Sequence, residues 1–170
     1  GYARSPFTPA RRGALARVRP DDVAAAVVKE LLARSGLDAA LIEDVIVGCA
    51  FPEGEQGFNL ARMLTFLSGL PNSVAGVTIN RFCGSSMQAI HDAAGRIAMG
   101  AGEAFVCGGV ESMTRVPMTG FNPMPNPRLT NEYPEAFTSM GVTAENLAER
   151  HDISRERQEE FAVESHRKAE

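Results

Sequence analysis

The sequence predicts an α/β domain in which helices cover a largely parallel sheet. Helical stretches alternate with short strands between Asp21 and Gly109. The strands are short and mainly apolar, as is typical of strands that are covered on both faces. In sheets of this kind, ligands gather where strands end and helices begin.

Each element of this domain follows from apolar spacing and from its glycine or proline stops. The expected helices are 21–34, 59–67 and 84–99, with a short helical turn at Leu41-Ile42. The expected strands are 45–47, closed by Gly48, then 74–80, and 104–107, stopped by Gly108-Gly109.

The pattern changes beyond residue 114. Five prolines lie within 115–138, and we expect neither helix nor strand before Thr138 or Ser139. A loop of this length is usually functional or serves assembly. Two helices then close the chain: Thr143 to Arg150, and a second that is N-capped by Ser154.

The composition is that of an ordinary globular protein. A net charge of −4 argues against nucleic acid as the main partner, although an anionic cofactor needs only a local basic pocket. No apolar run approaches the ~18 residues of a membrane span. The three cysteines lack the spacing of a metal site or a disulfide framework, so we expect no metal and a reducing, cytoplasmic location.

Both ends of the chain look cut. It begins at Gly1 without a methionine and stops at Glu170 inside a helical pattern, so we expect a piece of a larger protein. Five arginines and no acid precede residue 20, as in a transit peptide. A solvated basic loop is favoured, because Pro6, Pro9 and Gly13 interrupt any amphipathic helix there.

Cys83 is the candidate nucleophile. It follows an apolar strand and precedes Gly84-Ser85-Ser86 at the start of a helix, where free N–H groups and the helix dipole favour a thiolate. Gly84 lets a substrate carbonyl approach the backbone. Cys49 and Cys107 lie in or beside apolar strands, where packing is the expected role.

A thiolate nucleophile needs a proton acceptor, and the histidines offer none nearby. His91 lies eight residues along the same helix, about 12 Å away at 1.5 Å per residue. His151 and His166 lie on polar helices beyond the proline-rich loop, where a surface role is expected. We expect the base to be absent from this chain.

Four segments resemble the thiolase family, in order along the entire chain. The run Asn80–Ile90 resembles the segment that carries the acyl-accepting cysteine, and Gly108–Met113 resembles the second N-terminal signature. Arg4–Phe7 is similar to an early Arg-Thr-Pro motif, and Met140–Ala148 to the start of the coenzyme A-binding loop domain. Within the family, the chain is most similar to thiolases of bacterial fatty-acid β-oxidation.

The resemblance implies a fold and a division into domains. The fold is the N-terminal βαβαβαββ half of a thiolase, with layered α/β/α packing and its first strand largely missing. Residues 1–114 would form this core domain, and 115–170 would begin the loop domain. The second half, which supplies an activating histidine, an acid/base cysteine and an oxyanion-hole asparagine, is absent from the chain.

The resemblance also implies an acyltransferase that cleaves 3-ketoacyl-CoA through an acyl-Cys83 intermediate. Coenzyme A and acyl-CoA are then substrates, and no cofactor is permanently bound. The Cys83 N–H is a candidate oxyanion donor. Met113 and Met140 could pack on the acyl or pantetheine group, with core filling as the alternative. For Glu111 we favour a buried carboxylate that accepts backbone hydrogen bonds over a catalytic role.

The same resemblance implies a homodimer or homotetramer and a possible β-oxidation multienzyme partner. Two alternatives stay open. One is a biosynthetic acetoacetyl-CoA thiolase with the same cysteine chemistry. The other is a truncated, non-catalytic thiolase-like binding or scaffold protein.

Overall fold

The computed structural model describes residues 1–169 and divides them into two compact units. The first unit is Gly1–Pro123, and the second begins at Met124. The first unit contains a sheet with helices around it, whereas the described part of the second unit contains helices alone. The candidate nucleophile lies in the first unit.

The first unit is built on a parallel sheet with strand order β2-β1-β3. The strands are β1 (Ile42–Gly48), β2 (Ala75–Ile79) and β3 (Ala104–Gly109). The register aligns Gly48 with both Ile79 and Gly109, so the three strands end at one edge. This arrangement confirms the parallel α/β sheet that the sequence predicts.

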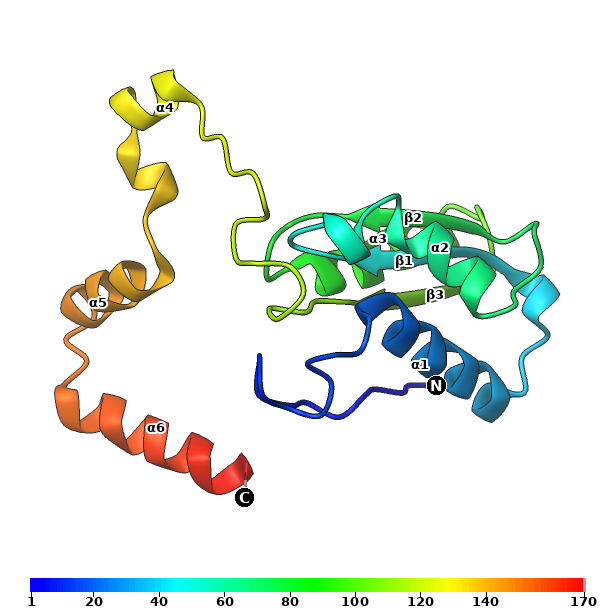
Figure 1. The fold of residues 1–170 in the computed structure, drawn as a ribbon, viewed down its shortest axis with the longest axis horizontal. Helices are drawn as coiled ribbons and strands as arrows, with labels where there is room; N and C mark the ends of the chain where they lie inside the picture. Colours follow the sequence, from blue (N-terminus) through cyan, green and yellow to red (C-terminus); the bar gives the residue numbers. More distant parts are fainter. Residues whose placement is uncertain (170) are drawn as a thin grey trace. The chain divides into compact units, whose positions relative to one another are not determined.

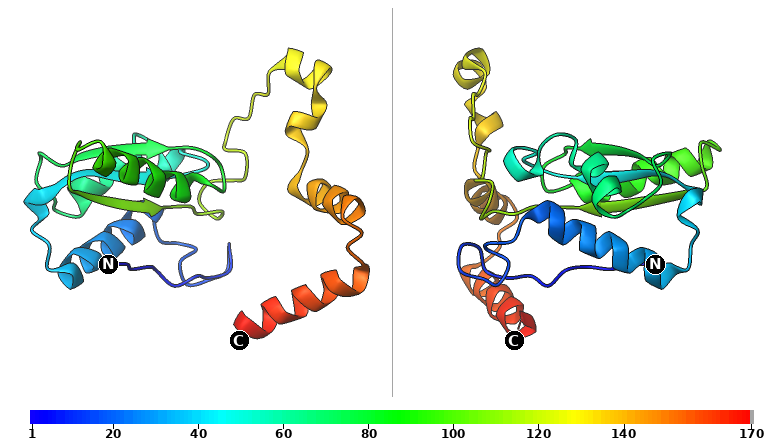
Figure 2. Two further views of the ribbon diagram at one scale, coloured as in Figure 1. Left: turned by 180° about the vertical axis from the view of Figure 1, so that it is seen from behind. Right: turned by 45° about the vertical axis from the view of Figure 1, so that its right-hand side comes forward.

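Helices cover both faces of this sheet, as Figure 1 and the two views of Figure 2 show. They are α1 (Pro20–Ser35), α2 (Leu60–Leu67) and α3 (Ser85–Ala98), with short 3-10 turns η1 (Ala39–Leu41) and η2 (Gly54–Gln56). Val45 and Val47 of β1 belong to the core shared with α1 and α2. Ile46, between them, packs with Ala89 and Ala93 of α3 on the opposite face. The α/β/α layering is therefore confirmed.

The strands are longer than predicted at two places. β1 begins at Ile42 and includes Asp44, whose charge interrupts the apolar run in the sequence. Asp44 is only 7% exposed, and its Oδ2 accepts a hydrogen bond of 2.6 Å from Arg96 of α3. β3 continues through Gly108 and Gly109, which pair with the end of β1 and so extend the strand instead of stopping it.

In the second unit, the prediction that no helix precedes Thr138 is wrong. The helix α4 spans Pro127–Glu132, and the 3-10 turn η3 spans Pro134–Phe137. Asn126 caps α4 by accepting hydrogen bonds from the N–H groups of Arg128 and Leu129, and Pro127 occupies its first position. Asn and Pro break a helix interior but favour a helix start, and this distinction was missed.

The two closing helices agree better with the prediction. The helix α5 spans Met140–Arg150, three residues longer than predicted, because Ser139 serves as its N-cap. The helix α6 spans Arg155–Ala169, and Ser154 accepts a hydrogen bond from the Arg157 N–H as predicted.

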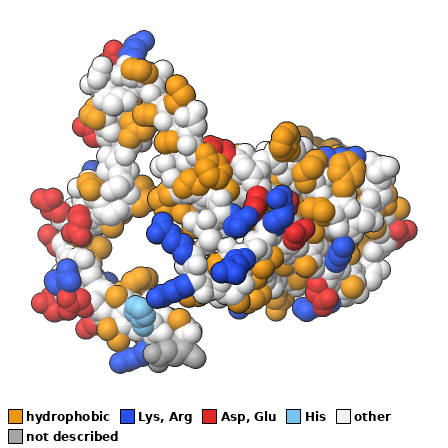
Figure 3. All heavy atoms as spheres, in the orientation of Figure 1, with side chains coloured by type: hydrophobic (Ala, Val, Ile, Leu, Met, Phe, Trp, Pro, Cys, Tyr) orange, Lys and Arg blue, Asp and Glu red, His pale blue; other side chains and the backbone are white. Residues whose placement is uncertain are grey.

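The N-terminal residues 1–19 contain neither helix nor strand, with turns only from residue 10 onward, and their five arginines are all exposed, as expected for a solvated basic loop. Figure 3 shows basic side chains gathered over this part of the first unit. Arg19 pairs with Asp21 at the start of α1, and with Glu55 of η2. Among the described residues, no helix is long and apolar enough to cross a membrane.

The Arg96–Asp44 pair gives a first prediction. Arg96→Ala leaves the Asp44 carboxylate buried without its cation, so we expect a loss of about 2 kcal/mol in the free energy of unfolding. The matched control is Arg34→Ala, which removes an exposed pair with Glu30 and should cost less than about 0.5 kcal/mol. Urea denaturation measures both, and equal losses would contradict the structural role of Asp44.

Candidate active site

The candidate site lies at the edge of the sheet where all three strands end. β1 is followed by Cys49-Ala50, β2 by the segment 80–84, and β3 by Val110-Glu111. Two backbone hydrogen bonds hold the segments after the strands side by side. Cys49 donates its N–H to Ile79 O, and Val110 donates its N–H to Gly48 O, each at 3.0 Å. This is the edge at which parallel sheets bind ligands.

Cys83 is exposed at this edge, two residues before α3 begins. Phe82, directly before it, has a φ of 45°, a left-handed conformation that is uncommon for a bulky residue. Gly84 occupies the N-cap of α3, and no side-chain oxygen caps the helix. The thiol therefore stands where a sharp turn meets a helix N-terminus that is open to an acceptor from outside.

Ser85 holds the turn in shape. Its side chain is almost fully buried at 3% exposure, and its Oγ accepts a hydrogen bond from the Arg81 N–H at 2.8 Å. The same hydroxyl donates to Phe82 O at 2.5 Å. The Gly84 N–H donates to Arg81 O at 3.0 Å, which closes the turn. The sequence marked Ser85 only as part of a small-residue turn.

Two glycines at the strand ends allow the first turn of α3 to pack closely on the sheet. A Cβ added to Gly48 would overlap the backbone at Ser85 and Ser86, and one added to Gly109 would stand 2.8 Å from Ser86 Cβ. The lack of side chains at the ends of β1 and β3 therefore lets the first turn of α3 lie directly on the sheet. The sequence predicts both glycines only as the ends of strands, because this contact joins segments that lie far apart along the chain.

A hydrogen-bond network ties the strand exits to one another. Glu111 accepts from the Ala50 N–H at 2.7 Å and from Gln56 Nε2 at 2.8 Å. Gln56 is fully buried, and its Oε1 accepts from the Ser112 N–H at 2.6 Å. Glu111 thus makes the expected hydrogen bonds, but the residue is exposed, so its expected burial is wrong. Gln56 was missed because a lone glutamine carries no sequence signal.

The other two cysteines differ from Cys83 in their surroundings. Cys49 is 1% exposed, and burial together with the nearby Glu111 carboxylate raises the pKa of its thiol to about 12. Burial also raises the pKa of Cys107, whose Sγ lies 3.4 Å from Ala89 O of α3. A raised pKa keeps a thiol protonated and unreactive at neutral pH, which agrees with packing roles for both.

The histidines lie as the sequence suggested. His91 is exposed on α3, and its place eight residues after Cys83 puts it about 12 Å along the helix. His151 follows α5 and His166 lies on α6, both in the second unit and both exposed. No group of His, Cys, Asp and Glu within residues 1–169 could hold a metal ion.

The two methionines predicted to contact substrate lie in different units. Met113 follows β3 in the first unit and is 39% exposed, whereas Met140 begins α5 in the second unit and is 69% exposed. Both side chains are accessible. Their contact with an acyl or pantetheine group stays a prediction.

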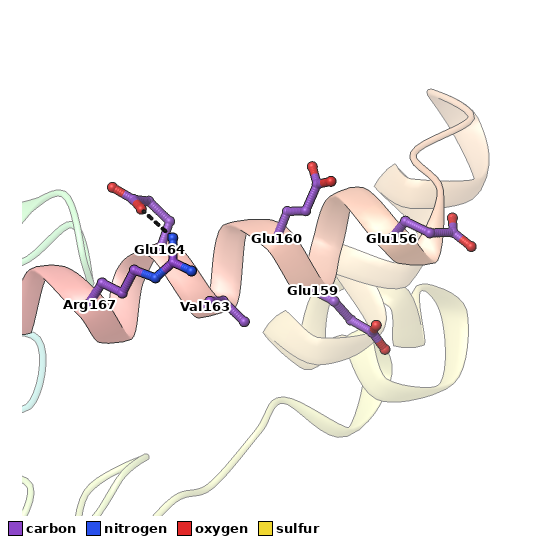
Figure 4. Close-up of a pocket in the computed structure, with 6 residues that line it drawn as sticks. All are labelled: Glu156, Glu159, Glu160, Val163, Glu164 and Arg167. Atoms are coloured by element: carbon purple, nitrogen blue, oxygen red, sulfur yellow. Dashed lines mark ion pairs between the residues drawn. The ribbon is translucent and has the colours of Figure 1, made fainter.

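A hollow on the second unit does not belong to this site. Figure 4 shows the residues that line it, and all of them come from α6. Four are glutamates: Glu156, Glu159, Glu160 and Glu164. Because all the lining residues belong to one exposed helix, the hollow is a shallow depression in a charged surface and does not indicate a binding site.

The sequence of the chain matches a known protein family. The family profile described as the N-terminal domain of thiolase matches residues 1–170. The chain belongs to the thiolase family. The match includes the Cys83 turn, the Gly108-Gly109 strand end and the second unit.

Curated relatives and a solved structure agree with this assignment. This thiolase chain is 48% identical over 167 residues to a 3-ketoacyl-CoA thiolase of Bacillus subtilis (strain 168), covering 98% of this chain and 43% of that relative. A 3-ketoacyl-CoA thiolase of Pseudoalteromonas translucida (strain TAC 125) gives the same identity and coverage. The crystal structure of the Bacillus anthracis acetyl-CoA acetyltransferase matches with a TM-score of 0.81 and 36% identity, covering 96% of this chain and 44% of that one. The thiolase chain thus spans less than half the length of these relatives.

The close contact of Gly48 with the first turn of α3 gives a second prediction. Gly48→Ala forces the first turn of α3 away from the sheet, so we expect a loss of about 2 kcal/mol in unfolding free energy and slower alkylation of Cys83 by iodoacetamide. The matched control is Gly95→Ala in the middle of α3, where an added Cβ meets nothing within 4 Å. It should gain up to about 1 kcal/mol from helix propensity and leave alkylation unchanged. Wild-type alkylation in Gly48→Ala would show that the contact does not place Cys83.

Proposed function

We propose that the complete protein is a 3-ketoacyl-CoA thiolase in which Cys83 carries the acyl group. The observation that supports this most directly is an exposed thiol at the strand edge, two residues before an uncapped helix N-terminus. The names of the relatives at 48% identity support the substrate class. The family membership supplies the reaction type, an acyl transfer.

In the proposed reaction the Cys83 thiolate attacks the keto carbon of 3-ketoacyl-CoA and forms a carbon–sulfur bond. The bond between the keto carbon and C2 then breaks, and its electron pair leaves with C2 as the enolate of acetyl-CoA. A proton from an acid elsewhere in the protein completes acetyl-CoA. The thiolate of a second coenzyme A attacks the acyl-cysteine and releases the shortened acyl-CoA. Thioester exchange of this kind is nearly neutral in energy, so Cys83 can both attack and leave.

The proton acceptor and the acid of this reaction come, in our proposal, from outside the first unit. His91 is the one histidine in that unit, and it lies about 12 Å along α3 from Cys83. The exposed face of α3 also carries the apolar side chains Met87, Ile90 and Ile97. Such a face supports packing of further protein against the helix that follows the nucleophile.

Other features of the proposed enzyme follow from the family resemblance. Coenzyme A and acyl-CoA are substrates, and Met113 and Met140 contact their acyl or pantetheine groups. We propose a homodimer or homotetramer, with a β-oxidation multienzyme complex as a possible partner. The three free cysteines support a location in the reducing cytoplasm.

Cys83→Ser tests the nucleophile directly. In the complete protein we expect it to abolish the acyl adduct formed with 3-ketoacyl-CoA, because a serine hydroxyl with an ordinary pKa is a far weaker nucleophile. Mass spectrometry of the intact protein and its peptides measures the adduct. The matched controls Cys49→Ser and Cys107→Ser should keep the adduct and lose stability only. An unchanged adduct in Cys83→Ser would overturn the assignment.

The biosynthetic acetoacetyl-CoA thiolase is the second candidate, since the matching solved structure is an acetyl-CoA acetyltransferase. The higher identity to 3-ketoacyl-CoA thiolases favours the degradative enzyme. We expect the complete protein to cleave substrates longer than four carbons, measured as thiolysis rates across a series of 3-ketoacyl-CoA chain lengths. Activity confined to acetoacetyl-CoA would support the biosynthetic enzyme. A complete protein that forms no adduct with any chain length would support the non-catalytic scaffold.

A further inference from the structure

Asn80 lies between the end of β1 and the turn that carries Cys83, and its side chain bonds to both. Its Nδ2 donates to Ala50 O at 2.9 Å, just beyond the end of β1. Its Oδ1 accepts from the Phe82 N–H at 2.8 Å. One short side chain therefore connects a strand exit to the residue directly before the nucleophile.

The strand side of this connection is fixed. Ala50, which accepts from Asn80 through its carbonyl, donates its N–H to the Glu111 carboxylate at 2.7 Å. Glu111 is held in turn by Gln56, which is fully buried. The Asn80 amide is thus anchored to a network that spans the ends of β1 and β3 and includes η2.

The turn side of the connection is strained. Phe82 has a φ of 45°, and a bulky residue keeps a left-handed conformation only where its surroundings hold it. Its N–H is held by Asn80, and its carbonyl accepts from the Ser85 hydroxyl at 2.5 Å and from the Ser85 N–H at 3.1 Å. Its ring lies 6.0 Å from that of Phe51, centroid to centroid.

We propose that Asn80 is a positioning residue for Cys83, which holds Phe82 in its left-handed conformation and thereby fixes where the thiol stands relative to α3. The proposal rests on the proposed function for its kinetic consequence. In the proposed reaction, Asn80 contacts no reacting atom. Without the Asn80 side chain, the peptide before Cys83 is free to relax toward an ordinary conformation and to move the sulfur.

A displaced nucleophile lowers the rate of the chemical step more than it weakens substrate binding. A misplacement of about 1 Å can cost about 100-fold in rate, because the attacking atom must approach the carbonyl carbon at the right distance and angle. In the complete protein we therefore expect Asn80→Ala to lower kcat by about 10- to 100-fold while KM stays within about threefold.

Two further variants make the experiment specific. Asn59→Ala is the matched control, because Asn59 also makes two side-chain hydrogen bonds, to Gly76 O and Thr78 Oγ1, away from the Cys83 turn. It should lose stability with no comparable loss of kcat per folded molecule. Asn80→Ser keeps a hydroxyl that can accept from the Phe82 N–H in the same kind of turn, so its kcat should lie between wild type and Asn80→Ala.

The rate of Cys83 alkylation by iodoacetamide provides a readout that does not depend on acyl-CoA. We expect Asn80→Ala to slow it by at least about threefold relative to wild type and to Asn59→Ala, because the turn no longer holds the Cys83 thiol in its exposed position before α3. If wild type forms no acyl adduct, the proposed function fails, and the alkylation rates still decide the role of Asn80. If Asn80→Ala does not fold, Asn80→Ser takes its place in both measurements. Losses of kcat or alkylation rate in the Asn80 variants that only equal those in Asn59→Ala would overturn the proposal.

Discussion

The close contact between the first turn of α3 and the ends of β1 and β3 is the constraint on which the rest of the structure depends. It exists because Gly48 and Gly109 have no side chains, so that the backbone at Ser85 and Ser86 lies directly on the sheet. Helix packing on a sheet usually leaves room for side chains between the two layers. Their absence here brings the start of α3 to the strand edge and leaves Cys83 exposed above it.

A polar network joins the segments that follow the three strands. Buried polar groups are costly unless they are hydrogen-bonded, and the fully buried Gln56 satisfies its side chain with Glu111, Phe51 O and the Ser112 N–H. Through Ala50 the network reaches the Asn80 side chain and so the strained peptide at Phe82. In the candidate site, the two glycines allow α3 to pack closely on the sheet, and the hydrogen bonds hold the conformation of the turn that carries Cys83.

Much of the fold was readable in the sequence, and the errors have identifiable physical causes. Buried parallel strands and amphipathic helices leave regular patterns, so the order of the α-helices and strands from α1 to β3 was correct, whereas the short 3-10 turn η2 was not predicted. Asp44 was excluded from β1 because its partner Arg96 lies 52 residues away and is invisible to local patterns. The start of α4 was missed because Asn126 and Pro127 break a helix interior but favour a helix start. Glycines that pair within a strand, such as Gly108, were read as stops.

By itself, the sequence determined the class of fold and the family resemblance, and it led to the proposal that Cys83, and not Cys49 or Cys107, is the nucleophile. Those conclusions depend on local order, since a strand, a cysteine and a helix start follow one another within a few residues. Only the tertiary structure decided how the turn is held. Gly48, Gln56, Asn80 and Glu111 come from four separate segments, and the parallel register brings them to one edge. Contacts between segments that are distant in the sequence leave no periodic pattern along the chain. They follow only from the pairing of the strands in the tertiary structure.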